Sequence, residues 1–157
     1  MKEIATLTIM RAQLDANSFY IGPDVSDWTG HIEIAADLGT VWFTGAIKAL
    51  GRIRSLAGSG IYAGEGIEAG RGIEAGEGIE AGRGIEAGEG IEAGEGIEAG
   101  WGIKAGWSVQ ATFVAVRLRI FVGLCSWRAP TKHEMQLRAE LREGMLAYGE
   151  HVAPAPM

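Results

Sequence analysis

Residues 60–106 repeat one hexapeptide, Gly-Ile-Glu-Ala-Gly-Glu, in which Arg, Trp or Lys replaces the residue at two of the positions. Isoleucine recurs at every sixth residue from Ile61 to Ile103, and alanine follows it two residues later from Ala63 to Ala105. Because six is an even number, these residues return to one face of an extended chain, whereas a helix of 3.6 residues per turn would scatter them. A strict repeat of this kind is typical of proteins built from stacked units.

Each unit is predicted to form a short strand, Ile-Glu-Ala, that points Ile and Ala inward and Glu outward. The Gly-x-Gly that follows is expected to be a corner, because glycine reaches the positive φ values that tight turns need. A single unit buries too little apolar surface to fold, so neighbouring coils must stack Ile on Ile and Ala on Ala. The sequence therefore predicts an all-β fold, a β-solenoid with terminal caps.

The residue between the two corner glycines indicates how many sides the solenoid has. A coil of two units would place Glu65 on Glu77, like charge on like, at a spacing of about 4.8 Å. A coil of three units instead places Glu65 beside Arg83. It also places Arg71 beside Glu89. Exposed pairs contribute about 0–1 kcal/mol each, so the charges favour three sides only as a preference.

Weaker repeats flank the regular one. Val41, Ile47 and Ile53 are six residues apart, and the eight-residue step from Ile53 to Ile61 is interpreted as a phase slip. The predicted organisation is an N-terminal strand with a turn-rich cap (1–30), a β-solenoid (31–128, with the regular repeat at 60–106), a C-terminal cap (129–150) and a disordered tail (151–157).

The C-terminal part leaves two structures open. Val109 and Ala111 occupy the Ile and Ala positions of the repeat, and residues 116–124 alternate like a half-buried strand. Thr131 and Glu134 fit a helical capping box, but residues 135–142 alternate apolar and polar as a strand does. The cap is therefore predicted to be a hairpin or a helix.

The formal net charge of the chain is −6, and the negative charge is concentrated in the repeat, which contains ten glutamates and three basic residues. An acidic surface repels nucleic acid and anionic membranes and favours a basic partner. The alternative is that these charges only keep a glycine-rich fold soluble and prevent aggregation at its edges.

Cysteine and histidine, which could act in catalysis or bind a metal, are scarce in this sequence. Cys125 is the single cysteine, which excludes an internal disulfide and a cysteine zinc site, and it is expected to be buried and inert. The three histidines, His31, His133 and His151, lie outside the repeat, so no nucleophile, base and orienting group can be placed together. We expect a non-enzymatic protein with no cofactor or metal site. The sequence has no signal peptide or membrane-spanning run, which predicts the cytoplasm of the host cell.

Two resemblances add to this interpretation. A three-sided hexapeptide coil resembles the left-handed β-helix of the hexapeptide acyltransferases, whose repeat opens as Ile67-Glu68 does but has a small residue where this chain has Arg71. The resemblance implies a left-handed solenoid but not acyl transfer, since those enzymes use a histidine near the coil.

The second resemblance covers about half of the chain. Residues 55–64, the repeat, and residues 118–125 with Trp127 and Arg128 are similar to small proteins of phages and prophages. Short proteins of that setting include anti-CRISPR and anti-restriction inhibitors, several of them acidic DNA mimics. The resemblance implies a phage-encoded inhibitor whose solenoid occupies a nucleic-acid-binding surface of a host defence complex.

The candidate partner-binding residues follow from this hypothesis. They are the outward glutamates of the repeat and two aromatic corner residues: Glu68, Glu74, Glu80, Glu86, Glu92, Glu98, Trp101 and Trp107. The expected partner is a basic nucleic-acid-binding protein or complex, with no direct binding to nucleic acid or membrane. Trp101, Trp107 and Phe113 would otherwise form a collar, one per edge, that packs against the C-terminal cap. The competing function is a structural or self-associating solenoid, such as a virion component, which would form homo-oligomers.

Overall fold

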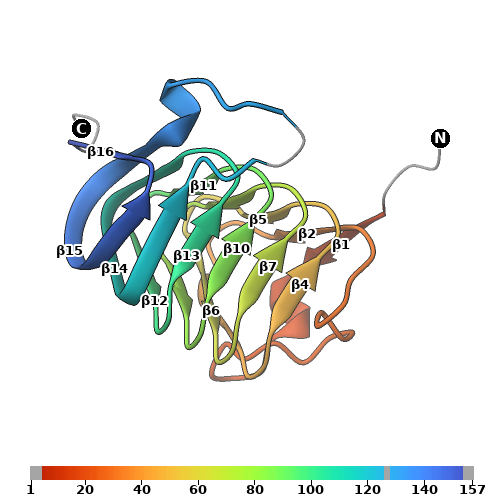
Figure 1. Cartoon of the computed structure of the whole chain (residues 1–157). Helices are drawn as coiled ribbons and strands as arrows, with labels where there is room; N and C mark the ends of the chain where they lie inside the picture. The colour runs from red at the N-terminus through yellow and green to blue at the C-terminus, as the bar shows by residue number, and fades with distance from the viewer. Residues whose placement is uncertain (1–4, 126–127, 154–157) are drawn as a thin grey trace.

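The computed structural model describes residues 5–125 and 128–153. These residues form sixteen strands and two single 3₁₀ turns, η1 (Arg11–Gln13) and η2 (His133–Met135), with no α-helix in either range. The strands pair in parallel along a β-solenoid of about seven turns of about 18 residues, which runs from β1 (Thr6–Ile9) at one end to β16 (Glu150–Val152) at the other (Figure 1). The predicted all-β solenoid is confirmed.

The solenoid has three flat faces, which we call A, B and C. Face A contains β1, β2 (His31–Ile34), β5 (Ile53–Ser55), β8 (Ile73–Ala75), β11 (Ile91–Ala93) and β16. Face B contains β3 (Gly39–Phe43), β6 (Ser59–Ala63), β9 (Ile79–Ala81) and β12 (Gly96–Ala99). Face C contains β4 (Ile47–Ala49), β7 (Ile67–Ala69), β10 (Ile85–Ala87) and β13 (Ile103–Ala105). Two long strands, β14 (Val109–Val122) and β15 (Gln136–Tyr148), continue around all three faces.

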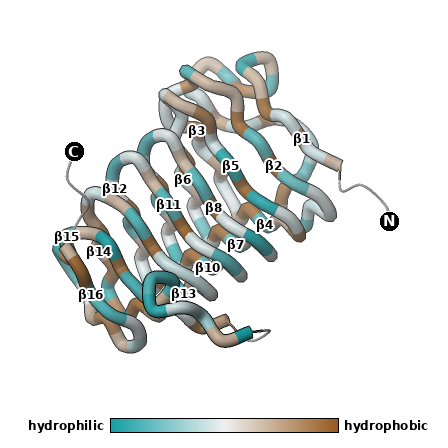
Figure 2. Tube along the Cα trace, turned by 90° about the horizontal axis from the view of Figure 1, so that it is seen from above, coloured by the Kyte–Doolittle hydropathy of each residue, from teal (hydrophilic) through white to brown (hydrophobic). Residues whose placement is uncertain are grey.

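Columns of Ile and Ala fill the interior, as predicted. On face C, Ile67, Ile85 and Ile103 stack in register and are almost completely buried, while the residue that follows each of them is exposed. The alternation of apolar and polar residues along each strand is visible in Figure 2. Burying one such isoleucine is worth about 1.5–3 kcal/mol, so the columns supply the stabilisation that a single hexapeptide lacks.

The corner residues stack with a period of 18, which confirms three sides. The amide of Arg83 donates to the carbonyl of Glu65 at 3.1 Å. In the same way, the amide of Glu89 donates to the carbonyl of Arg71 at 3.2 Å. The opposite charges therefore lie on adjacent turns of the same corner.

The role predicted for the corner glycines is wrong. The described glycines with positive φ are Gly39, Gly58, Gly123, Gly144 and Gly149, and none of these is a corner glycine of the regular repeat. The first glycine of each repeat corner instead lies against the backbone of the preceding turn. A Cβ on Gly100, for example, would overlap the carbonyl oxygen of Gly82. Close stacking of turns, rather than left-handed backbone, is the reason for this glycine.

The predicted phase slip is present. Ile47 pairs with Ile67, twenty residues later, whereas Ile67 pairs with Ile85 at the regular spacing of eighteen. The two extra residues lie in the corner before Ser59, where Gly58 has φ of 78°. Ser59 is fully buried there; its hydroxyl donates to the carbonyl of Ala35 at 2.5 Å and accepts from the amide of Leu38 at 3.0 Å.

The turn-rich segment before His31 completes the first turn of the solenoid. Phe19 forms a parallel bridge with Trp42 on face B, and Trp28 forms one with Ala49 on face C. The expected N-terminal strand is observed as β1, and residues 1–4 lie outside the described residues.

The chain after Val109 departs from prediction in two places. β14 turns two corners rather than forming one half-buried strand, so Leu118 projects into solvent where an inward residue was expected. The segment predicted to be a hairpin or a helix is neither, because β15 pairs in parallel with both β14 and β16.

This last turn has 14 residues between paired positions, Gln136 and Glu150. The shortened turn breaks the 18-residue period, so the alternation over residues 135–142 indicated a strand but not its parallel pairing with β14. His151 and Val152 belong to β16, so the predicted disordered tail is wrong for them, while residues 154–157 lie outside the described residues.

Candidate functional site

The solenoid places the six candidate glutamates on three faces, two on each. Stacking with a period of 18 brings Glu68 beside Glu86 on face C, Glu74 beside Glu92 on face A, and Glu80 beside Glu98 on face B. Adjacent turns are about 4.8 Å apart, so the glutamates form three separate carboxylate pairs rather than three long columns.

Both glutamates on face C have a lysine in the same column. Lys48 precedes Glu68 by one turn, and its Nζ lies 3.8 Å from the Glu68 carboxylate. Lys104 follows Glu86 by one turn, with its Nζ at 3.7 Å from that carboxylate. The two lysines therefore flank the two glutamates, and the charges of these four residues sum to zero.

On face A, one glutamate of the pair has a basic neighbour. Arg54 precedes Glu74 by one turn, and its Nε lies 3.4 Å from the Glu74 carboxylate. Glu92 has Gln110 on its other side. These ion pairs are about half exposed, so each is worth about 0–1 kcal/mol, but they lower the negative charge of faces A and C.

Face B has no basic residue in the corresponding positions. Tyr62 precedes Glu80 by one turn, and Ala115 follows Glu98. Neither glutamate forms an ion pair with any residue that the structure describes. Burial and the neighbouring Glu98 carboxylate raise the pKa of Glu80 above its usual value. The negative charge of the repeat is therefore least compensated at this pair.

The neighbouring corner adds two further carboxylates. Glu77 and Glu95 stack on the corner between faces A and B, and the amide of Glu95 donates to the carbonyl of Glu77 at 3.2 Å. We call Glu77, Glu80, Glu95 and Glu98 the acidic surface. A surface of this kind can attract a basic protein.

An aromatic column lies next to the acidic surface on face B, and sequence reasoning missed it. Phe19, Trp42 and Tyr62 occupy successive turns, with ring centroids 5.9 Å and 4.3 Å apart. Offset aromatic pairs add about 0.5–1.5 kcal/mol each to their burial. Trp42 and Tyr62 are twenty residues apart, so the phase slip was the signal that could have placed them in one column.

The three aromatic corner residues form the expected collar, one at each edge, and an arginine lies over each ring. Arg128 lies over Trp107 with its Cζ 4.8 Å from the ring centroid, and Arg142 lies over Phe113 at 3.8 Å. Both arginines come from the C-terminal segment. Trp101 is covered differently, by Arg83 of the preceding turn at 5.4 Å.

The histidines and the cysteine, which are the other side chains that could act in catalysis or bind a metal, do not form a cluster among the described residues. The ring Nδ1 of His31 accepts from the amide of Arg52 at 2.8 Å, and a ring nitrogen of His151 lies 2.7 Å from the carbonyl oxygen of Ala139. Cys125 is half-buried rather than buried as expected. Within residues 5–125 and 128–153, no group of three or more His, Cys, Asp or Glu side chains could hold a metal ion.

No helix in the part of the chain that the structure describes is long and apolar enough to cross a membrane. No protein-family model matches the chain, and no similar protein is found among curated proteins or among solved structures.

Proposed function

We propose that this solenoid is a non-enzymatic binding protein, a phage-encoded inhibitor that acts in the cytoplasm of the host cell. Its acidic surface would occupy the nucleic-acid-binding surface of a host defence complex. The observation that carries the proposal is the contrast between faces: Glu80 and Glu98 have no basic neighbour in their column, whereas Glu68, Glu86 and Glu74 each have one.

The charge density of the acidic surface is close to that of DNA. Two carboxylates per turn of about 4.8 Å give one negative charge per about 2.4 Å along the solenoid axis. B-DNA has one per about 1.7 Å of axis, counting both strands. A groove lined with Lys and Arg could therefore bind the acidic surface in place of a duplex over the length of two turns.

The ion pairs give the candidate glutamates unequal roles in this proposal. Of the six outward glutamates, we assign the main role to Glu80 and Glu98, supported by Glu77 and Glu95 on the adjacent corner. The ion-paired glutamates on faces A and C have smaller expected roles, because a partner would have to compete with Lys48, Lys104 or Arg54.

A capture experiment tests this proposal. Tagged protein is incubated with nuclease-treated lysates of CRISPR-bearing and restriction-proficient bacteria, and recovered proteins are identified. We expect a nucleic-acid-binding complex with the native protein, and its loss with the E80Q/E98Q variant. The matched control E68Q/E86Q removes two charges from face C and should keep the complex. Recovery of only the protein itself would contradict the proposal, as would equal recovery by both variants.

A self-associating solenoid is the second candidate function. Met145 and Tyr148 on the last turn are exposed, which favours contact at that end. However, the last turn has 14 residues between Gln136 and Glu150, whereas the first has 25 between Thr6 and His31. A second copy would not continue all three faces in register. Light scattering that shows concentration-dependent growth would favour this function over inhibition.

A further inference from the structure

The Trp101 corner differs from the other two corners of the collar. The C-terminal segment covers Trp107 and Phe113, which are half-buried, but Trp101 is 57% exposed. Leu118 follows Trp101 on the next turn of the same corner, where its amide donates to the Trp101 carbonyl at 2.9 Å, and Leu118 is 61% exposed. Two large apolar side chains therefore lie together in solvent, at a corner where earlier turns have charged residues.

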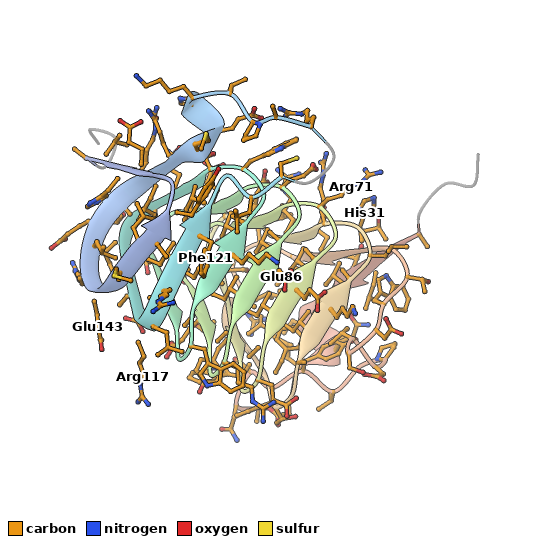
Figure 3. The ribbon with its side chains drawn as sticks, in the orientation of Figure 1. His31, Arg71, Glu86, Arg117, Phe121 and Glu143 are labelled. Atoms are coloured by element: carbon orange, nitrogen blue, oxygen red, sulfur yellow. The ribbon has the colours of Figure 1, made fainter. Side chains whose placement is uncertain are left out.

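Arginines surround this apolar pair. Arg83 lies over the Trp101 ring, and Arg117 and Arg119 flank Leu118 in the sequence and are both exposed. Neither Arg117 nor Arg119 forms an ion pair with a described residue, and Figure 3 shows Arg117 projecting away from the solenoid at the same edge as Glu143. We call Arg83, Trp101, Arg117, Leu118 and Arg119 the Trp101 edge.

A hollow lies on each side of the Trp101 edge. The hollow on face C, of about 510 Å³, is lined by Trp101, Phe121 and Arg119. The hollow on face B, of about 400 Å³, is lined by Trp101 and Arg117 and also by three carboxylate residues, Glu80, Glu98 and Glu143. Trp101 is thus the ridge between a recess on face C, which has Arg83 and Arg119 beside it, and a mainly acidic recess on face B.

We propose that the Trp101 edge is a docking surface for an acidic segment of a partner protein, in which apolar side chains alternate with carboxylates. The apolar residues would contact Trp101, Leu118 and Phe121, and the carboxylates would pair with the arginines. Trp and Arg are the residue types most often found at the energetic centre of protein interfaces. Arg83 and Arg119 on the face C side of this edge would attract the carboxylates of the segment, whereas the acidic surface, whose Glu80 and Glu98 line the hollow on face B, would repel them.

The contacts that Trp101 and Leu118 can offer favour a protein segment over nucleic acid. Arg83 already covers the Trp101 ring, which leaves less of it available for stacking on a base. Leu118 offers an apolar contact that a sugar-phosphate backbone cannot use.

Fluorescence anisotropy with a defined probe tests the proposal. The probe is a fluorescein-labelled twelve-residue peptide in which Leu and Phe alternate with Glu and Asp. Two further peptides serve as controls, one with Ser in place of the apolar residues and one with Lys in place of the acidic residues. We expect saturable binding of the first peptide that weakens with salt, and at least tenfold weaker binding of both controls.

Variants of the full chain locate the site. W101R introduces the residue that the repeat has at the equivalent position of Arg83, so the corner can accommodate it. It removes the apolar contact while adding positive charge, and we expect at least tenfold weaker binding of the acidic peptide. L50R changes a leucine that is 64% exposed at another corner and should leave binding unchanged. E77Q/E95Q changes two carboxylates of the acidic surface that line neither hollow, so this variant should bind the peptide normally, which separates the two sites.

Three results would overturn the proposal. Tighter binding by W101R would mean that charge alone attracts the peptide. Equal weakening by L50R would mean that the contact is not at this edge. Competition between the peptide and a twenty-nucleotide oligo(dT), with the oligonucleotide binding more tightly, would assign the edge to nucleic acid.

Discussion

Glu80 and Glu98 stand one turn apart in the same column of face B, and the carboxylate of Glu98, together with burial, raises the pKa of Glu80. The same repeat places glutamates one turn apart on the other two faces, where lysine or arginine occupies a neighbouring turn. An almost uniform sequence repeat therefore produces a solenoid with unequal faces.

The raised pKa of Glu80 predicts a pH-dependent stability. A carboxyl group whose pKa is higher in the folded state binds more protons folded than unfolded, so it lowers stability as the pH rises above the unfolded value of about 4.5. E80Q should stabilise the protein at pH 7 by about 0.5 kcal/mol, the size of a like-charge cross-strand contact, and by nothing at pH 3. Urea unfolding at both pH values measures the difference. E86Q, which loses the Lys104 ion pair, should not stabilise at pH 7.

Close stacking of the corners predicts that the two glycines of one corner differ. Gly82→Ala places a methyl group on the carbonyl oxygen of Gly64 and should cost about 2–3 kcal/mol, because the backbone of two turns would have to separate. At Gly84 the nearest atom to an added Cβ is the Gly102 oxygen at 3.5 Å, so Gly84→Ala should cost less than about 1 kcal/mol. Thermal unfolding compares them, and equal losses would contradict the stacking argument.

The buried hydroxyl of Ser59 stabilises the corner that contains the two extra residues of the phase slip. It bonds the carbonyl of Ala35 and the amide of Leu38, which lie in the preceding turn. Ser59→Ala leaves both groups without this partner inside the protein and should cost about 1–3 kcal/mol. Ser108→Ala, at a half-buried corner position without these bonds, is the control and should be nearly neutral.

The segment that covers Trp107 contains an ion pair between Arg128 and Glu134. Arg128 donates to both Glu134 carboxylate oxygens, at 2.9 and 2.6 Å, and this bonding, together with the Thr131 amide that donates to the same carboxylate, lowers the pKa of Glu134 to about 2. The stabilisation is present above the ordinary Glu pKa and is lost as the pH falls toward 2. NMR titration should find the pKa of Glu134 raised toward 4.5 in R128Q, and amide exchange near residue 134 should become faster. An unchanged Glu134 pKa would contradict this account.

The sequence predicted the features that depend on the repeat alone. The spacing of Ile and Ala determined the inner columns, the charges at Glu65 and Arg83 favoured three sides, and the step from Ile53 to Ile61 revealed the phase slip. The C-terminal turn could not be predicted, because its length of 14 residues removes the period, and its bends at Gly144 and Gly149 use positive φ.

The unequal charge of the faces was also missed. Six successive units have the same outward glutamate, so the difference arises from the residues one turn before or after them. Lys48 and Arg54 precede Glu68 and Glu74 by twenty residues, across the phase slip, whereas Tyr62 precedes Glu80 by the regular eighteen. Assigning Lys48 and Arg54 to their glutamates therefore requires both the three-sided coil and the phase slip to be placed correctly.

The most direct test of the proposed function is displacement of DNA from a captured complex. Anisotropy of a fluorescein-labelled duplex bound to that complex is followed as the solenoid is added. We predict release of the duplex by the native protein and by E68Q/E86Q, with E80Q/E98Q needing at least tenfold more protein, equivalent to about 1.4 kcal/mol. Simultaneous binding of the duplex and the solenoid, with unchanged affinity for DNA, would contradict the proposal that the acidic surface takes the place of nucleic acid.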